Sequence, residues 1–290
     1  MGRTWRLILD HKHRAAYNMA ADETILKSYA DGNSLPTLRL YGWEKPAISL
    51  GFFQDLEKSD IDKDYCRDLD IELVRRPTGG RAVVHGCDIT FSVVLAERDI
   101  PDGFHSVLGS HTWLMKGIIA AFGLLDIKAE MGSGERDGDK AQSADCFAST
   151  AGCDVRVGRD KVAGAAQVRK WGAILEQGSI PYEPPGLDLV RIFGRAAGKP
   201  GTSVLAEIPF KAARMAVVVG FEQALGIRFI PAPLTENETE TAFCLSKEKY
   251  SSAEWTYRAG ALRIDNTIMG CYTDGRLRGG RNHAEENSRR

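Results

Sequence analysis

The chain has 290 residues, of which 43% are hydrophobic, and 38 Lys and Arg against 39 Asp and Glu give a formal net charge of -1. This length and composition favour one large globular domain, alone or with a small appendage. The near-neutral charge gives no general electrostatic reason to expect nucleic acid or an anionic membrane as a partner. No 18 apolar residues run together, and the N-terminus resembles neither a secretory signal nor a transit peptide, so we expect a cytoplasmic protein without a transmembrane helix.

Helix-like and strand-like segments alternate through the first 230 residues, with no repeat or long linker between them. Apolar residues at helical spacing predict helices, and alternating or short continuous apolar runs predict strands. The predicted helices cover residues 15–30, 106–123, 187–193 and a segment that follows Pro209. The predicted strands cover residues 38–41, 46–51, 71–76, 82–85, 89–95, 154–158, 161–166 and 173–180. This alternation favours a single α/β or α+β domain.

Two polar segments interrupt this pattern. Residues 126–145 contain glycine and have no periodicity, so we expect a mobile loop that a ligand would order. Cys146 stands where this loop ends, and Lys161 starts the returning strand of a predicted hairpin. The glycine-rich, charged residues 259–290 are expected to be partly disordered, which places a domain boundary after residue 258.

The six cysteines are scattered along the chain, with no CxxC pair and no clustered histidine. They are Cys66, Cys87, Cys146, Cys153, Cys244 and Cys271. This spacing argues against a zinc site and against a disulfide framework in a chain of this size. Each cysteine is therefore either a small buried hydrophobic residue or a reactive thiol, and no metal site is expected.

The segment 75–85 (RRPTGGRAVVH) is the first with candidate chemistry. Two arginines precede a double-glycine turn, which lets backbone N–H groups approach a ligand closely. Such a turn suits an anionic or strongly polarised group, although an ordinary hairpin with solvated arginines has the same pattern. It is neither a P-loop, since GKS and GKT are absent, nor the GxGxxG of a dinucleotide fold.

Two further segments surround a lysine and a cysteine. Small residues follow Lys161 (KVAGAAQ) and leave a smooth trough for an alkyl chain, although most lysines after a turn are simply solvated. Asp145 precedes Cys146 and raises the pKa of that thiol, which argues against reactivity unless a cation compensates. Lys161 is the candidate cation.

Taken in order, these segments resemble the lipoate–protein ligase and octanoyltransferase superfamily over most of the chain. The matching motifs are NMAADE (18–23), YGW (41–43), PAISLGFFQ (46–54), the arginine and double-glycine segment, and GRDKVAGAAQ (158–167). Within that superfamily, TGGR (78–81), the Cys146–Phe147 pair and the interval from that cysteine to Lys161 are most similar to octanoyl-[acyl carrier protein]:protein octanoyltransferases of the Gram-positive type.

The resemblance implies a fold and a set of residue roles. The fold is a single α/β (α+β) domain with a central mixed sheet flanked by helices, of the lipoate ligase and biotin ligase catalytic type, over residues 1–258. Cys146 is then the nucleophile that takes the acyl group as a thioester, and Lys161 lowers the pKa of its thiol and stabilises the oxyanion. The implied substrate-binding residues are Arg75, Arg76, Thr78, Gly79, Gly80, His85, Ala163, Gly164, Ala165 and Gln177.

The implied activity attaches an octanoyl or lipoyl group to a lysine of a lipoyl-carrier protein. Acyl carrier protein is the donor, and glycine cleavage H protein or another lipoyl-domain protein is the acceptor. A transferase of this kind requires no cofactor. The alternative is a lipoate–protein ligase that uses ATP and magnesium through an acyl-adenylate, and a third hypothesis is a non-enzymatic relative that only binds acyl carriers. The sequence does not identify the base that deprotonates the attacking lysine.

Three positions depart from the superfamily pattern. Gln177 stands where a histidine is frequent, Gly86 follows His85 where an aspartate is usual, and Ala148 stands where an acidic residue is frequent. Each departure is compatible with a changed carrier protein, a changed donor or an ATP-using relative. The resemblance also suggests that the polar loop before Cys146 is a lid that excludes water from the thioester.

Overall fold

The computed structural model describes residues 3–132, 154–194 and 203–257. Cys146 and its neighbours, residues 133–145 of the expected loop, and the expected C-terminal extension 259–290 all lie outside the described residues. In the described part, no helix is both long and apolar enough to cross a membrane.

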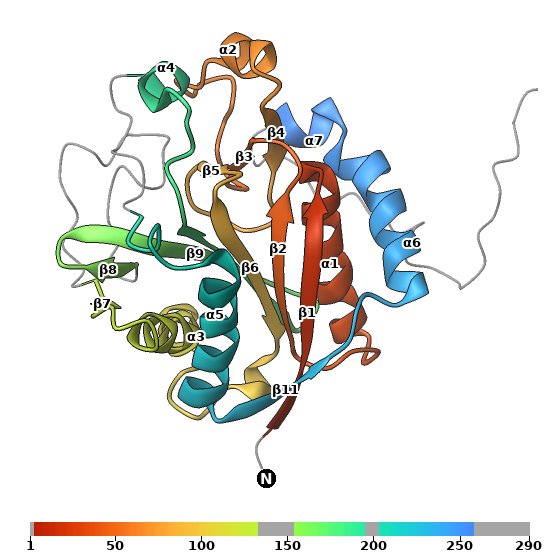
Figure 1. The fold of residues 1–290 in the computed structure, drawn as a ribbon. Coiled ribbons are helices and arrows are strands. Elements are labelled where there is room, and N and C mark those ends of the chain that lie inside the picture. Colours follow the sequence, from red (N-terminus) through yellow and green to blue (C-terminus); the bar gives the residue numbers. More distant parts are fainter. Residues whose placement is uncertain (1–2, 133–153, 195–202, 258–290) are drawn as a thin grey trace, which may run out of the picture.

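The central layer is an eight-stranded sheet in the order β11-β1-β2-β6-β10-β9-β8-β7 (Figure 1). β1 pairs in parallel with both β11 and β2, whereas β2–β6, β6–β10 and β10–β9 are antiparallel, so the sheet is mixed as predicted. Its strands are β1 (Arg3–His13), β2 (Thr37–Trp43), β6 (Asp88–Leu95), β7 (Glu130–Met131), β8 (Val155–Val157), β9 (Asp160–Lys170), β10 (Ala173–Pro181) and β11 (Ile227–Pro231).

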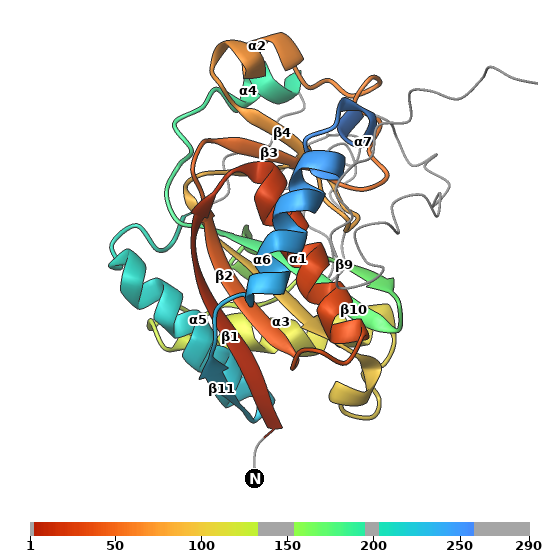
Figure 2. The same cartoon turned by 90° about the vertical axis from the view of Figure 1, so that its right-hand side faces the viewer.

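Helices cover both faces of this sheet. α3 (Val107–Gly123) and α5 (Phe210–Leu225) pack on one face, and α1 (Ala15–Ala30) and α6 (Glu236–Leu245) on the other (Figures 1 and 2). A Cβ at Gly220 would lie 2.4 Å from the carbonyl oxygen of Gly117, so these glycines allow α3 and α5 to approach closely. The largest apolar cluster lies between this helix pair and the sheet.

A second, three-stranded sheet stands at one end of the molecule. β3 (Ala47–Leu50) is its central strand, with β4 (Glu72–Arg75) parallel on one side and β5 (Val83–His85) antiparallel on the other. The short helices α2 (Lys63–Asp68) and α4 (Leu189–Phe193) lie at the same end (Figure 1), and their apolar side chains form one cluster with those of β3. The other helical turns within the described residues are η1 (Glu97–Asp99), η5 (Ser246–Tyr250) and α7 (Ala253–Tyr257).

Several elements differ from those expected from the sequence. Glu130 and Met131 form β7 within the segment expected to be a loop, because they pair with Arg156 and Val155 of β8. β1 and β11 were not predicted as strands. They form strands by pairing in parallel with each other, although they are far apart in the sequence. Local periodicity carries little information about such pairing. The hairpin of β8 and β9 has the predicted position, with a left-handed Gly158 (φ +60°) at its turn.

Candidate active site

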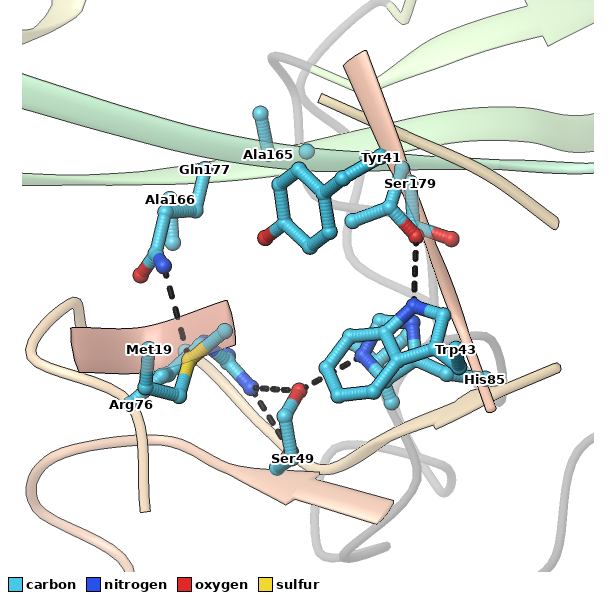
Figure 3. A pocket seen from close by; sticks show the side chains of 15 residues that line it. Met19, Tyr41, Trp43, Ser49, Arg76, His85, Ala165, Ala166, Gln177 and Ser179 are labelled. Atoms are coloured by element: carbon cyan, nitrogen blue, oxygen red, sulfur yellow. Dashed lines mark hydrogen bonds between the residues drawn. The ribbon is translucent and has the colours of Figure 1, made fainter. Parts of the chain in front are cut away.

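A cavity lies between the large and the small sheet, with Met19 of α1 in its wall (Figure 3). Its empty volume is about 490 Å³, which includes space open to solvent. β2, β6, β9 and β10 contribute side chains from the large sheet, and β3 and β5 contribute them from the small one. Of the residues predicted to bind substrate, six line this cavity: Arg76, Gly80, His85, Gly164, Ala165 and Gln177.

Lys161 packs directly behind one wall of this cavity. Its side chain is only 5% exposed, and its Nζ lies 3.1 Å from Oδ1 of Asp154, whose side chain is equally buried. A Cβ on Gly164 would lie 2.6 Å from Cε of Lys161 and 2.8 Å from its Nζ, so the absent side chain of this lining residue gives the ammonium its place. The alternative that Lys161 is an ordinary solvated lysine is therefore wrong.

Arg76 points into the space between the sheets, where it contacts Ser49 (Figure 3). It also binds its own double-glycine turn. Its Nη2 donates to the carbonyl oxygens of Gly79 (2.6 Å) and Arg81 (2.8 Å), and its Nε donates to Oγ1 of Thr78 (3.1 Å). Its Nη1 donates to both the carbonyl oxygen (2.8 Å) and Oγ (3.2 Å) of Ser49. All five N–H groups of the guanidinium thus have protein acceptors, so Arg76 shapes the turn.

The double-glycine turn passes very close to the end of β3. A Cβ on Gly51 would lie 1.8 Å from the carbonyl oxygen of Gly80, a distance that no side chain tolerates. Gly80 itself has a left-handed backbone (φ +86°), which residues with a Cβ adopt rarely. Gly51 and Gly80 therefore both require glycine for steric reasons. The double-glycine pattern in the sequence indicated this for Gly80 but not for Gly51.

Arg75, which the resemblance implies as a substrate-binding residue, does not line the cavity. Its side chain is fully buried, and Nη1 donates to the carbonyl oxygens of Gly51 (2.9 Å), Phe52 (3.0 Å) and Gln54 (2.6 Å). On the other side, Nε and Nη2 donate to carbonyl oxygens of α7 at 3.0 and 2.8 Å. Burial lowers the pKa of Arg75. This arginine joins the segment after β3 to the end of the described chain.

The other predicted binding residues have indirect positions. Thr78, Gly79 and Ala163 are not part of the cavity lining. Thr78 donates through Oγ1 to Oε1 of Gln177 (2.9 Å), and thereby connects the double-glycine turn to β10. Ala163 is buried in the main apolar cluster, on the helix side of the sheet.

His85 is held by two hydrogen bonds and one stacked ring. Figure 3 shows its contacts with Ser49 and Trp43. Its Nε2 lies 2.8 Å from Oγ of Ser49, its Nδ1 lies 2.8 Å from Oδ2 of Asp88, and its ring stacks on Trp43 at a centroid distance of 4.1 Å. Burial favours a raised pKa for Asp88, yet the charge of His85 and the hydrogen bonds to the carboxylate hold this pKa below its ordinary value. Gly86 follows His85 where the superfamily usually has an aspartate, and Asp88, two residues further on, provides the carboxylate partner of the histidine instead.

Gln177 connects β10 to α1 at the position where the superfamily often has histidine. Its Nε2 lies 2.7 Å from Oδ2 of Asp22 and 3.5 Å from Sδ of Met19, and its Oε1 accepts from Thr78. An amide donates and accepts at once with more hydrogen-bond capacity than one neutral imidazole. Asp22 also binds Arg39 (2.8 Å), so this part of the motif NMAADE attaches α1 to the sheet. In the sequence, NMAADE contributed only to the family resemblance, and no structural role was predicted for Asp22.

The geometry of Cys146 relative to Lys161 stays a prediction, because this cysteine lies outside the described residues. Among the described cysteines, burial raises the pKa of Cys66 to about 11, with a further contribution from Asp62. Burial, with Glu183 and Asp88, also raises the pKa of Cys87. Neither thiol has an environment that favours the thiolate. Within the described ranges, no group of three or more His, Cys, Asp and Glu side chains is arranged to hold a metal ion.

The fold and the cavity define an α/β protein with a pocket between two sheets, beside a buried lysine. The family model for the lipoyl protein ligase A/B catalytic domain matches residues 14–223, and the chain belongs to this family. The predicted superfamily is thereby confirmed.

Relatives resemble the chain over nearly their whole length. Octanoyltransferase LipM of Symbiobacterium thermophilum is 36% identical over 280 residues, which cover 89% of this chain and 100% of the relative. Octanoyltransferase LipM of Kyrpidia tusciae is 37% identical over 275 residues (88% and 99%). Among solved structures, a putative lipoate protein ligase from T. acidophilum with bound lipoic acid has a TM-score of 0.71 at 27% identity (89% and 100% covered). Lipoate-protein ligase A bound with ATP has a TM-score of 0.72 at 26% identity (89% and 99%).

Proposed function

We propose that the protein transfers an octanoyl group from acyl carrier protein to a lysine of a lipoyl-carrier protein, through a thioester on Cys146. The observation that carries this proposal is the buried ammonium of Lys161, held against Gly164 at the wall of the cavity. The similarity to relatives named octanoyltransferases over 88–89% of the chain supports the same reaction. In this scheme residues 1–258 form the catalytic unit and residues 259–290 an extension.

The first half-reaction moves the acyl group to the enzyme. The Cys146 thiolate attacks the carbonyl carbon of the donor thioester, and the new C–S bond forms as the carbonyl oxygen becomes an oxyanion. The oxyanion collapses, the bond to the carrier sulfur breaks, and the carrier leaves as a thiolate that takes up a proton. The Lys161 ammonium favours both the attacking thiolate and the oxyanion, because both carry negative charge.

The second half-reaction forms the amide. The lysine of the acceptor attacks the acyl-Cys146 carbonyl as a neutral amine, so it must lose one proton before the attack and one after it. The C–S bond then breaks, and Cys146 returns as a thiol. The proposed acceptor is glycine cleavage H protein or another lipoyl-domain protein. During both steps the alkyl chain lies in the cavity beside Gly164 and Ala166.

Intact-mass analysis tests this function. Incubation with octanoyl-acyl carrier protein is expected to add one octanoyl group to the wild-type protein and none to Cys146→Ala. Cys244→Ala is the matched control, because this partly exposed cysteine lies in α6, away from the cavity, and should still be loaded. Full loading of Cys146→Ala would contradict the proposal. Turnover of any acyl donor would also exclude a protein that only binds acyl carriers.

The second candidate is an ATP-dependent lipoate–protein ligase, favoured by the similarity to ligase structures at TM-scores of 0.70 to 0.72. In that scheme Lys161 and the double-glycine turn hold an acyl-adenylate, and Cys146 has no covalent role. Modification of the acceptor from free lipoate, ATP and magnesium, retained in Cys146→Ala, would select the ligase. Modification from octanoyl-acyl carrier protein without nucleotide would select the transferase, which needs no cofactor.

A further inference from the structure

The cavity wall contains many polar side chains, and their donor hydrogens are already used within the protein. The five N–H groups of Arg76 all point to acceptors in Ser49 and the double-glycine turn. Trp43 donates through Nε1 to Oγ1 of Thr90 (2.7 Å), and the Tyr41 hydroxyl donates to Oδ2 of Asp22 (3.0 Å). The wall therefore contains many polar side chains, but the N–H and O–H groups of these side chains already donate within the protein.

The same holds for the side chains around Asp88. The hydroxyls of Thr90 and Ser179 donate to Oδ2 of Asp88 at 2.7 and 2.8 Å. An ionised carboxylate only accepts, so Nδ1 of His85 carries the proton in its hydrogen bond to Asp88. At the other ring nitrogen, Nε2 lies 2.8 Å from Oγ of Ser49, so this side of the ring also has a hydrogen-bond partner within the protein.

Gln177 completes the network at the α1 side of the cavity. Its amide nitrogen is directed to Asp22 and to the sulfur of Met19, and its amide oxygen accepts from Thr78. Among the described residues that line the cavity, each polar side-chain donor thus has an acceptor inside the protein. Some hydroxyl oxygens, such as Oγ of Ser49, keep an unused lone pair, so the wall still has acceptors.

We infer that this closed donor network makes the cavity selective for an unsubstituted acyl chain and against a chain of the same length that carries an oxo group. The inference rests on the proposed function, in which the acyl chain enters this cavity. A ketone oxygen only accepts hydrogen bonds, and it loses its water donors on entry without finding a side-chain donor in exchange. A hydroxyl group is disfavoured less, because it can donate to a spare lone pair.

The expected discrimination follows from the cost of an unpaired polar group. An apolar pocket rejects an added hydroxyl by roughly 100-fold, and an unpaired buried carbonyl belongs to the same range. The rate of acyl-enzyme formation at low substrate should therefore be roughly 10- to 100-fold higher for octanoyl than for oxo-octanoyl chains, with hydroxy-octanoyl between them.

The test compares three thioesters of acyl carrier protein on the wild-type enzyme: octanoyl, and octanoyl with an oxo or a hydroxyl group at the penultimate carbon. Intact-mass analysis over time gives kcat/KM for acyl-enzyme formation. Equal rates for octanoyl and oxo-octanoyl would overturn the inference and leave the proposed transferase standing. No loading by octanoyl itself would instead overturn the proposed transferase.

Ser49→Ala tests the network directly. It removes the hydroxyl oxygen that accepts from Nη1 of Arg76, so this N–H can donate to an oxo group in the cavity, and the rate ratio of octanoyl to oxo-octanoyl should fall about tenfold. Val83→Ala is the matched control, since Val83 lines the same cavity and carries no polar group. An equal fall in both variants would show that cavity size sets the preference, and would overturn the role of the network.

Discussion

The ammonium group of Lys161 lies where it does because residue 164 is a glycine and has no side chain. Lysine is seldom buried, and here its ammonium is paired with Asp154 and occupies the space that a Cβ on Gly164 would take. The pair therefore stands at the cavity wall, where burial strengthens the effect of the ammonium on a nearby charge. The sequence placed a lysine before a run of small residues, and the structure gives the reason why one of them is glycine.

The first residue-scale prediction concerns this lysine. Lys161→Ala is expected to lower the rate of acyl loading on the order of 100- to 1,000-fold, because it removes the cation that stabilises thiolate and oxyanion. Rapid-quench intact-mass analysis with octanoyl-acyl carrier protein measures that rate. Lys58→Ala is the control, since the side chain of Lys58 is 85% exposed and does not line the cavity. Unchanged loading in Lys161→Ala would remove Lys161 from the mechanism.

Two adjacent arginines have different roles for a related geometric reason. Successive side chains of an extended strand point to opposite faces, and Arg75 is the last residue of β4. Arg76 therefore reaches the cavity and the double-glycine turn, whereas Arg75 reaches α7. The sequence showed a pair of cations, and without the direction of the strand it could not distinguish a cavity residue from a structural one.

At the scale of elements, Arg75 holds two separate segments together. Its guanidinium binds three carbonyl groups after β3 and two in α7, and the indole Nε1 of Trp255 donates back to the carbonyl oxygen of Arg75 at 2.8 Å. The segment after β3 carries Gly51, which contacts the double-glycine turn. The position of α7 and the shape of the cavity wall are thus connected through one side chain.

The element-scale prediction is a loss of stability in Arg75→Met. The substitution leaves five buried carbonyl groups without their donor, and we expect the free energy of unfolding to fall by about 3–5 kcal/mol. Urea unfolding followed by tryptophan fluorescence measures this loss. Arg67→Met is the control: Arg67 is 73% exposed and pairs with its neighbour Asp64 in α2, so the change should be within about 0.5 kcal/mol. An equal loss of unfolding free energy in the two variants would contradict the role of Arg75 in joining the segment after β3 to α7.

At the scale of the whole molecule, buried carboxylates connect the helices to the sheet. In α1, Glu23 binds Lys249 of η5 (2.5 Å) and Lys170 of β9 (3.3 Å), and in α6, Glu238 binds Arg6 of β1 (2.7 Å). Burial favours raised pKa values for Glu23 and Glu238, but the lysines around the first and the arginine beside the second hold both pKa values below the ordinary one.

These carboxylates predict acid sensitivity. In acid the unfolded chain binds protons that the folded protein does not, so stability is complete above the unfolded pKa and falls as the pH drops below about 4.5. Each such group adds up to about 1.4 kcal/mol per pH unit to the slope. Urea unfolding between neutral and acidic pH measures how the free energy of unfolding depends on pH. Glu238→Gln should lower the slope of this dependence by the contribution of one carboxyl group. A free energy of unfolding that is independent of pH in acid would contradict this account.

The sequence by itself determined the family, the mixed α/β class and most of the antiparallel core, because these follow from local periodicity and from motifs that are contiguous in the chain. It also identified Lys161, Arg76, Gly80 and His85 as residues of one site, and all four lie in or against the cavity wall.

Only the tertiary structure decided how distant segments meet. In the pairing of β1 with β11, Arg3 lies opposite Ile227; Arg75 reaches a residue 180 positions away, and Gln177 binds Asp22 across 155 positions. Such contacts depend on the packing of complete elements, which no local pattern encodes. For the same reason the sequence listed the polar residues of the cavity but not that their donors satisfy one another, and this pairing is what sets the proposed preference for an unsubstituted acyl chain.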